Sequence, residues 1–363
     1  MIEALRQLGQ VEVVVINFFW PGESKPPERV DTLLDGVSVI ELNLTVKGWL
    51  GRPRFDLPSA YVTGVVAQHV DFTSYDVIVS RYVKPALKLK LPPRVPVVVD
   101  FDDAVFHPPW GTLATLKMKV GALLRLVNDR LIVRGRLRLG GLNHRHYFFC
   151  REAERQAFPW LPGSVLPNLP AAAQREGAVP VFAQPDTPGL MFIGLLDYLP
   201  NQDAVDWFLD AIWPKVLEKV PQARFLVVGK GSPEKCRAWS AQPNVEVLGF
   251  VESLADAYAR VTASVVPMRG GAGTNIKALE AYQYGRPVVA TRHVIDAFAP
   301  LFRDGIDMLA SDSDARIAEF CIDLLQHPDR AEAMARSGHA RMREHLNPAR
   351  FNQIVREVME KLG

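Results

Sequence analysis

Short apolar runs recur along this chain, and segments with helical patterning separate them. Turn residues bound each run, as expected of strands that are buried inside a sheet. The runs are VEVVVINFF, YDVIVS, VPVVVDF, HYFFC, LMFIG, RFLVVG, VEVLGF, ASVVPM and PVVAT. Alternation of such strands with helices predicts an α/β protein whose parallel sheets are covered by helices on both faces.

The composition changes at residues 167–188, which hold five prolines and several alanines without strong periodicity. Such a segment is typical of a linker between domains. A new apolar run follows directly, and 363 residues are enough for two domains. We therefore expect two doubly wound α/β domains, residues 1–166 and 189–345. In such sheets, ligands bind beyond the carboxyl ends of the strands.

The chain begins with a helical pattern rather than a strand. Ile2, Leu5 and Leu8 form one apolar stripe, Gly9 ends it, and the run VEVVV follows. A doubly wound domain ordinarily begins with a strand and a loop, so we expect the first domain to lack its first strand. Either translation starts upstream, where an in-frame strand and a glycine-containing loop would be encoded, or the gene is shortened.

The composition excludes several classes of protein. Hydrophobic residues make up 48% of the chain, and the net charge of +2 confines any basic site to a local region. Cys150, Cys236 and Cys321 form no CxxC pair, which argues for a reducing cytosol and against structural zinc or a disulfide framework. No signal-peptide pattern opens the chain, and its apolar runs are too short and too charged to span a bilayer. We therefore expect a cytoplasmic protein.

A glycine-rich loop between a strand and a helix is the most informative motif. The segment PMRGGAGTNIKALEAYQYGRPVVAT predicts a strand at 263–268 and a helix at 274–284. Gly270, Gly271 and Gly273 let the backbone turn sharply and approach a ligand closely. The free amides at the start of the helix, together with its dipole, make an anion site.

Three charged side chains accompany this loop. Arg269 enters it from one side, and Lys277 and Glu280 lie on one face of the helix. The set suits a diphosphate held by the amides, Arg269 and Lys277, with Glu280 accepting hydrogen bonds from a vicinal diol such as a ribose. The alternative is an ordinary strand–helix turn with a solvated Lys277–Glu280 pair. The loop matches neither GxxxxGK[ST] nor GxGxxG, so neither a P-loop nor a dinucleotide fold is supported.

The segment resembles the nucleotide-sugar site of the GT-B glycosyltransferases, specifically of glycosyltransferase family 4. The family motif is roughly P-x-R-x-G-x-G-T-x-x-K-x-L-E-A, followed by G-x-P-V-V. The matching residues are Pro267, Arg269, Gly271, Gly273, Thr274, Lys277, Leu279, Glu280, Ala281, Gly285 and Pro287. FIGLLDYLPNQDAVDWF, FLVVGKG, NVEVLGFVESLADAYA and VLPNLP resemble further family segments. The resemblance covers most of residues 145–345 and implies two Rossmann-like domains that face a cleft, with the C-terminal helix, 346–363, packed back on the first domain.

The family binds a nucleotide-diphosphate sugar mainly in its second domain. Carried over to this sequence, Glu280 would bind the ribose, and Arg269 and Lys277 would contact the diphosphate. The other implied donor-binding residues are Gly194, Gly229, Phe250, Val251, Gly271, Gly273, Thr274 and Asn275. Among them, the glycine at 194 would let the backbone approach the phosphates, and the backbone at 250–251 would contact the base.

Two positions depart from the family pattern. Ala272 stands where many members carry a glutamate that contacts the sugar. Leu195 and Leu196 stand where many members carry arginine and lysine. Arg269 is therefore expected to neutralise more of the diphosphate charge, and the residues that recognise the sugar are not defined.

In the first domain, VPVVVDFDDAVFHPPW places acidic residues at the carboxyl end of a predicted strand. The segment resembles the family's D-x-x-D strand end, and we predict Asp102, Asp103 and His107 as catalytic residues. The alternatives are that Asp102 or Asp103 caps the next helix and that His107 is a solvated loop residue. Asp100 and Asp102 also form a DxD pattern, which metal-dependent transferases of another fold use. The resemblance implies a site without metal, so no metal ligand is predicted.

Residues 112–149 are locally basic, with leucines and valines interleaved. The basic residues are Lys117, Lys119, Arg125, Arg130, Arg134, Arg136, Arg138 and Arg145, against the single acid Asp129. A basic amphipathic helix suits an anionic membrane surface, and we expect replacement of the arginines at 134, 136 and 138 by glutamine to weaken docking without unfolding the protein. The alternative is a solvated helix with one core face. Aromatic interleaving is too poor to favour nucleic acid as a partner.

These patterns and the family resemblance predict a hexosyltransferase that moves a sugar from a nucleotide-diphosphate donor to a glycan or lipid-linked acceptor. The resemblance implies retention of configuration. No cofactor is expected besides the donor substrate. The protein would be cytoplasmic and peripheral on the inner face of the membrane. The alternatives are a nucleotide-sugar 2-epimerase, which shares the fold, and a non-catalytic partner that keeps the donor pocket.

Overall fold

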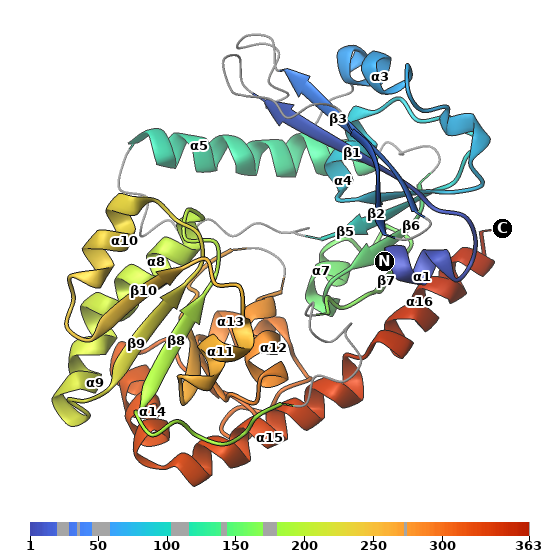
Figure 1. The fold of residues 1–363 in the computed structure, drawn as a ribbon. Helices are drawn as coiled ribbons and strands as arrows, with labels where there is room; N and C mark the ends of the chain where they lie inside the picture. Colours follow the sequence, from blue (N-terminus) through green and yellow to red (C-terminus); the bar gives the residue numbers. More distant parts are fainter. Residues whose placement is uncertain are drawn as a thin grey trace. The chain divides into compact units, whose positions relative to one another are not determined.

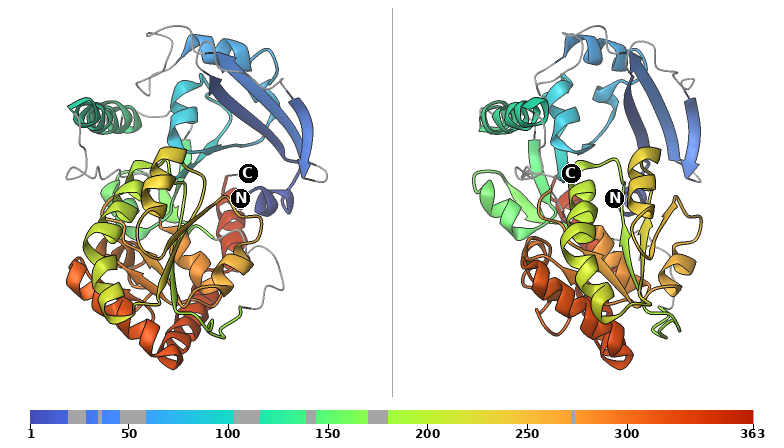
Figure 2. Two further views of the ribbon diagram at one scale, coloured as in Figure 1. Left: turned by 60° about the vertical axis from the view of Figure 1, so that its left-hand side comes forward. Right: turned by 90° about the vertical axis from the view of Figure 1, so that its left-hand side faces the viewer.

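The computed structural model describes residues 1–19, 29–34, 37–45, 59–102, 116–138, 144–169, 180–271 and 274–362. The chain divides into two compact units, which Figures 1 and 2 show in sequence colours. The described residues of the first unit lie within 1–104, 115–166 and 351–363, and those of the second lie within 167–350. Each unit has its own sheets and its own buried apolar clusters.

The second unit is built on one parallel sheet with the strand order β10-β9-β8-β11-β12-β13. The strands are β8 (Gly189–Ile193), β9 (Arg224–Val228), β10 (Val245–Gly249), β11 (Ala263–Val266), β12 (Val288–Ala290) and β13 (Leu309–Ala310). The helices are α8 (Leu199–Trp207), η5 (Phe208–Ile212), α9 (Trp213–Lys219), α10 (Pro233–Ser240), α11 (Leu254–Ala259), α12 (Ile276–Gln283), α13 (Arg292–Ala297), α14 (Asp314–Gln326) and α15 (Pro328–His345). The strand order reverses between β8 and β11, and this switch point is where such sheets bind ligands.

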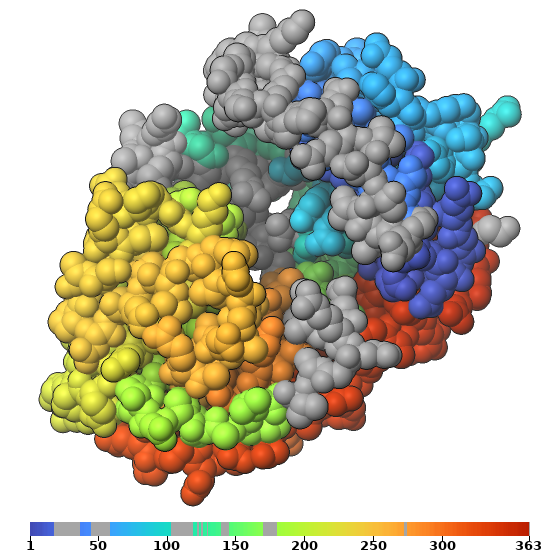
Figure 3. Space-filling model, viewed as in Figure 1, coloured from blue at the N-terminus to red at the C-terminus, as the bar shows by residue number. Residues whose placement is uncertain are grey.

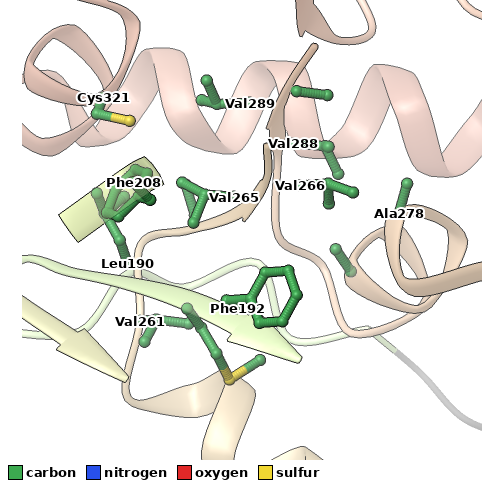
Figure 4. Packing of buried hydrophobic residues seen from close by; sticks show 14 of the residues in the cluster. Leu190, Phe192, Phe208, Val261, Val265, Val266, Ala278, Val288, Val289 and Cys321 are labelled. Carbon is green, nitrogen blue, oxygen red and sulfur yellow. The ribbon is translucent and has the colours of Figure 1, made fainter. Parts of the chain in front are cut away.

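Both faces of this sheet are buried under helices. Figure 1 shows α8 and α9 on one side of the sheet and α11 and α12 on the other. Phe192 of β8 and Val265 of β11 are fully buried. Figure 4 shows these strand side chains in one cluster with Phe208 and Ala278, which come from helical segments. Burial on both faces explains why the strand sequences are continuous apolar runs without alternation.

The segment 180–188, which the sequence predicted as part of the linker, lies against the second unit. Arg286 is almost fully buried and donates a hydrogen bond to the carbonyl of Val181 at 2.6 Å. Phe182 contacts the ring of His339 on α15, with 5.8 Å between the ring centroids. Figure 3 shows this green segment at the surface beside the red helix. Arg286 therefore anchors this stretch of the chain.

The first unit contains two sheets, with the strand orders β1-β3-β2 and β4-β5-β6-β7. The strands are β1 (Glu12–Phe19), β2 (Arg29–Leu34), β3 (Val37–Thr45), β4 (Ile78–Arg81), β5 (Val97–Phe101), β6 (His144–Phe149) and β7 (Gly163–Val165). The helices are α1 (Ile2–Arg6), α3 (Ala60–Val66), η1 (Phe72–Ser74), α4 (Val83–Lys88), α5 (Leu116–Val127), η3 (Asn128–Val133), α6 (Arg134–Arg138), α7 (Glu152–Ala157) and α16 (Pro348–Glu360). All nine predicted apolar runs form strands in the two units, which confirms the α/β class.

One strand pair departs from the predicted parallel pattern. β2 pairs with β3 antiparallel, whereas β1 pairs with β3 parallel. Only two residues connect β2 to β3. A connection of this length permits a hairpin but no crossover, so the pair is antiparallel.

The two ends of the chain meet in one apolar cluster of the first unit. Ala4 of α1 and Val355 and Val358 of α16 are buried together with Val98 of β5 and Phe148 of β6. The helix that precedes β1 therefore covers the same sheet as the last helix of the chain.

Candidate functional site

The glycine-rich loop connects β11 to α12 at the switch point of the second sheet. Met268, the second residue after the strand, is buried, and Gly271 has a φ of 131°, a backbone conformation that favours glycine. Gly273, like Ala272, lies outside the described residues. The helix runs from Ile276 to Gln283, so it begins two residues later and ends one residue earlier than predicted. The amino-terminal end of this helix lies at the carboxyl edge of the sheet, as the motif requires.

Lys277 lies in a partly apolar setting. Its Nζ donates to Asn201 Oδ1 at 2.7 Å and to Met268 Sδ at 3.5 Å, and it lies 4.7 Å from the centroid of the Phe192 ring. Burial lowers the pKa of the Lys277 ammonium to about 7, although the charge of Glu280 acts in the opposite direction. A lysine in this state gains from any anion that enters the site.

Glu280 follows Lys277 by one helical turn, and the two form no ion pair within the described part of the structure. Burial raises the pKa of the Glu280 carboxyl, while Lys277 lowers it. The hydroxyl of Tyr258 is buried and has no hydrogen-bond partner among the described residues. Burial and the charge of Glu280 raise the pKa of Tyr258. The alternative of a solvated surface pair at 277 and 280 is therefore wrong.

Arg269 is held by a carboxylate and an aromatic ring. Its Nη2 and Nε donate to the two carboxylate oxygens of Asp203, at 2.5 and 3.2 Å. Its guanidinium lies 4.7 Å from the centroid of the Trp207 ring. The side chain of Asp203 is 3% exposed and that of Arg269 is 41% exposed. The guanidinium thus has a buried edge that meets Asp203 and a part that reaches solvent.

Sequence reasoning missed these α8 residues. Asn201, Asp203 and Trp207 all lie in LPNQDAVDW, the helix that follows β8. The available signal was a run of small polar residues in the first turns of a helix at the carboxyl edge of the sheet, beside the motif's own strand. Their partners could not be identified because residues 66 or more positions apart in the sequence make these contacts.

The predicted glycines at 194 and 229 mark a close approach of two strand ends. A Cβ at Gly229, whose φ is 136°, would lie 1.8 Å from the carbonyl oxygen of Gly194. A Cβ at Gly194 would lie 2.7 Å from Nδ2 of Asn201. Both positions therefore require glycine for packing alone, whether or not a ligand binds beside them.

The other predicted positions border the same edge of the sheet. Phe250 is 79% exposed directly after β10, and Val251 packs partly against the core. Asn275 is the residue before α12, and the Thr274 hydroxyl accepts a hydrogen bond from Asn168 at 3.0 Å. Asn168 thus ties residues 167–169 to the glycine-rich loop within the second unit.

In the first unit, the acidic segment lies at the end of β5, as predicted. Asp103 and His107 lie outside the described residues. Asp102 is near Arg81, with 3.8 Å between Oδ2 and Nη2. Burial raises the pKa of Asp100 to about 6, although Arg81 acts to lower it. Asp100 is therefore a carboxyl with a raised pKa at this strand end, and sequence reasoning had not selected it as catalytic.

Residues 116–138 of the basic segment form one run of helical turns, α5, η3 and α6, whereas Arg145 lies in strand β6 and not on a helix. Its exposed apolar side chains are Val120, Leu123, Leu124, Val127 and Leu131. Their spacing of three and four residues places them on one face. Lys119 and Arg130 are exposed beside them. No helix of the described residues is long and apolar enough to cross a membrane.

Three arginines of this segment have contacts inside the first unit. The guanidinium of Arg134 lies 4.8 Å from the Phe158 ring centroid, and that of Arg138 lies 4.5 Å from the Trp160 ring centroid. Arg136 donates a hydrogen bond to the carbonyl of Leu87. Replacement of these three by glutamine would remove these contacts, and the expectation that the variant stays folded remains a prediction.

Comparison with known proteins identifies the class. Residues 187–327 match the family model described as glycosyl transferases group 1. A phosphatidyl-myo-inositol mannosyltransferase of Mycobacterium tuberculosis is 28% identical over 263 residues, which cover 70% of this chain and 66% of that relative. This chain therefore matches somewhat less than two thirds of the relative's length.

Solved structures show the same fold along nearly the whole chain. A sucrose-phosphate synthase from Thermosynechococcus elongatus matches 99% of this chain and 91% of its own, with 16% identity and a TM-score of 0.67. A trehalose-6-phosphate protein from E. coli bound with UDP-2-fluoro glucose matches 99% and 94%, with 11% identity and a TM-score of 0.63. The fold is that of the GT-B proteins. The chain resembles the group 1 glycosyltransferases, as its glycine-rich motif predicted.

Proposed function

We propose that this protein is a retaining glycosyltransferase that moves a hexose from a nucleoside-diphosphate sugar to a glycan or lipid-linked acceptor. The arrangement of Lys277, Glu280 and Arg269 at the switch point of the second sheet carries this proposal. The match of residues 187–327 to the group 1 family supports it. The lipid in the name of the mycobacterial relative, a phosphatidyl-myo-inositol mannosyltransferase, supports a lipid-linked acceptor.

The donor's diphosphate would lie at the start of α12. The helix amides there, together with the helix dipole, favour an anion. Lys277 and the solvent-facing part of Arg269 would neutralise charge that develops on the leaving diphosphate. Glu280 would accept hydrogen bonds from the ribose, and the backbone beside Phe250 would contact the base. We propose that these cations suffice without a metal ion, which transfer assays in EDTA and in magnesium would test.

The acceptor would be bound by the first unit. We propose Asp102, together with Asp103 and His107, as the residues that orient the acceptor hydroxyl. Asp100 is a further candidate, because a carboxyl with a pKa near 6 can exchange a proton near neutral pH. Asp102→Asn should lower the rate of transfer and leave the affinity for a nucleoside diphosphate unchanged, as measured by calorimetry.

The main test is calorimetry with UDP, GDP, ADP and the matching nucleosides. Lys277→Ala should weaken the best-binding diphosphate roughly tenfold or more, since a charged hydrogen bond contributes about 1.5–3 kcal/mol. The bare nucleoside should bind as before. Unchanged diphosphate binding in this variant would remove the main physical support for the proposal.

Arg269→Ala needs its own control. The change would leave Asp203 buried without its cation, which destabilises the site regardless of any ligand. The double variant Arg269→Ala/Asp203→Ala removes both charges, so its loss of diphosphate affinity would report the missing guanidinium with less structural disturbance.

Two rival functions are separated by product analysis. An epimerase would convert the nucleotide-sugar without an acceptor, whereas a transferase would leave the sugar stereochemistry of unused donor unchanged. A non-catalytic partner would bind the donor and give no product with any acceptor. Retention would be read from the anomeric configuration of the new glycosidic bond.

We also propose that α5 and η3 dock on an anionic membrane surface. The exposed stripe that includes Leu123 and Leu131, with Lys119 and Arg130 beside it, supports this role, because apolar side chains insert at the interface while cations meet lipid headgroups. The protein should co-sediment with vesicles containing anionic lipid and be released by salt. Leu123→Gln with Leu131→Gln should weaken this binding. Equal recovery with neutral and anionic vesicles would contradict the proposal.

A further inference from the structure

Two polar residues near the start of α8 are almost fully buried, and each contacts one of the two cationic residues of the motif. Asn201 is 5% exposed and Asp203 is 5% exposed as whole residues. A buried amide or carboxylate is unfavourable unless its hydrogen bonds are satisfied. The partners of these two side chains therefore explain why α8 carries them.

The side-chain amide of Asn201 has a defined orientation. Its Nδ2 donates to the carbonyl of Leu195 at 2.8 Å. A carbonyl accepts hydrogen bonds only, so the NH₂ end of the amide must face it. Oδ1 is therefore the end that faces Lys277, at 2.7 Å from Nζ. The loop after β8 thus determines which end of Asn201 the lysine meets.

Asp203 fixes the guanidinium of Arg269 in both position and plane. Two hydrogen bonds from the guanidinium to the two oxygens of one carboxylate define the direction of the fork. The ring of Trp207, one helical turn further along α8, lies over the guanidinium at 4.7 Å. A surface arginine without these contacts would sample many rotamers, and ordering it on binding would reduce affinity.

We propose that Asn201 and Asp203 are positioning residues that hold Lys277 and Arg269 ready for a diphosphate. This inference rests on the proposed function, since it assigns no ligand other than the donor diphosphate. The carboxylate of Asp203 would otherwise be unfavourable beside an anion site, and orientation of Arg269 explains its presence there. Neither side chain need touch the donor.

A double-mutant cycle tests each pair separately. Affinity is measured by calorimetry with inorganic pyrophosphate and with the tightest binder among UDP, GDP and ADP. Asn201→Ala should weaken both probes about fivefold to tenfold, and should have no further effect in the Lys277→Ala background. Asp203→Asn should behave in the same way toward Arg269→Ala. Such non-additivity identifies residues that act through a shared partner.

A matched control is available on the same helix. Asp206 pairs with Lys235 at 2.7 Å and accepts from Trp239 Nε1 at 2.7 Å, and neither partner is a cation of the motif. Asp206→Asn therefore breaks an ion pair of α8 and should leave pyrophosphate affinity unchanged. If Asp206→Asn lowers the affinity for pyrophosphate as much as Asp203→Asn does, α8 contributes only general stability and the inference fails.

A second variant covers the case in which Asn201→Ala unfolds. Asn201→Asp keeps the size and the acceptor for Lys277 while adding a charge. Glu280 on α12 is the other charged group that acts on this lysine. Its charge raises the pKa of Lys277, as a carboxylate at position 201 would, whereas burial lowers that pKa. The variant should keep Lys277 protonated to higher pH than wild type does. The ratio of the variant's pyrophosphate affinity to the wild-type affinity should therefore rise from pH 6 to pH 9. A constant ratio contradicts the inference.

The outcomes separate this inference from the proposed function. Unchanged pyrophosphate binding in both Lys277→Ala and Arg269→Ala would overturn both. Weakened binding in those two variants, with unchanged or additive effects of Asn201→Ala and Asp203→Asn, would overturn the positioning role alone.

Discussion

The ammonium group of Lys277 contacts the ring of Phe192, the sulfur of Met268 and the side-chain amide of Asn201. Its pKa of about 7 lies below the ordinary value of 10.5 because burial disfavours the charged form. A residue in this state is suited to an anionic ligand but is unfavourable for the stability of the empty protein. Binding and stability therefore make opposite demands on this residue.

Replacement of Lys277 by methionine should stabilise the protein in a pH-dependent way. Between about pH 7 and 10.5, the unfolded chain binds a proton at Lys277 that the folded chain has lost, so wild-type stability rises with pH in this window. Lys277→Met removes the penalty that is largest below pH 7. Its free energy of unfolding should exceed that of wild type at pH 6, and the difference should shrink toward pH 10.

The exposed Lys230 offers a control for this measurement. Urea unfolding of Lys230→Met should show no such trend with pH. A Lys277→Met difference that stays constant from pH 6 to pH 10 would mean that the lysine is well solvated in the folded state.

Glu280→Gln is expected to give a different binding pattern from Lys277→Ala. The glutamine keeps the size of the side chain but loses the charge that would accept the ribose hydroxyls. Affinity for both the nucleoside and the nucleoside diphosphate should fall by roughly 1.5–3 kcal/mol per charged hydrogen bond lost. Calorimetry with both probes checks this, and a nucleoside that binds unchanged would exclude Glu280 from the ribose site.

At the scale of elements, α12 is held in place by α15. Tyr282 of α12 is fully buried and donates to the carbonyl of Asp307 at 2.6 Å. The ring of His339 lies 3.0 Å from the carbonyl oxygen of Tyr282. The two helices approach closely at Gly338, where a Cβ would lie 2.2 Å from the Tyr282 ring. The motif helix therefore depends on a helix that contributes no predicted ligand contact.

Gly338→Ala should destabilise the second unit and weaken diphosphate binding. Alanine favours a helix over glycine by about 1 kcal/mol, but the clash with a buried ring costs about 1–3 kcal/mol and displaces α12. Gly121→Ala is the opposite case, because a Cβ there has no atom within 4 Å. It should stabilise α5 by roughly 0.5–1 kcal/mol. Urea unfolding measures the change in the free energy of unfolding for each variant, which should fall for Gly338→Ala and rise for Gly121→Ala. Equal effects of the two changes would contradict the packing argument.

The sequence predicted the strands whose residues form continuous apolar runs and missed strands that are very short or interrupted by polar residues. β8, β9 and β11 are continuous apolar runs, which only a doubly covered strand tolerates. β3 was missed because Ser38, Glu41 and Asn43 interrupt its apolar residues. In the site, Lys277 and Glu280 were identifiable because one helix carries both at a fixed spacing. Asn201 and Asp203 were not, since only the folded sheet brings α8 to the glycine-rich loop.

At the scale of the whole molecule, the chain returns to its first unit through α16. Val355 and Val358 are buried with Val98 and Phe148, whereas the described residues of the glycine-rich motif belong to the second unit. The residues proposed for the donor therefore share no buried cluster with α16. Stability of the first unit and donor affinity are expected to be separable properties.

Val355→Ala tests this separation. Removal of two buried methyl groups from the cluster should destabilise the first unit by about 1–3 kcal/mol, from lost burial and the cavity left behind. The affinity for the best-binding nucleoside diphosphate, measured at 25 °C, should equal that of wild type. In thermal unfolding, a saturating diphosphate should raise the transition of the second unit by the same amount in both proteins, because a ligand stabilises only the folded unit that binds it. A transition of the second unit that falls with Val355→Ala, or a diphosphate affinity that falls with it, would show that the first unit contributes to the donor site directly.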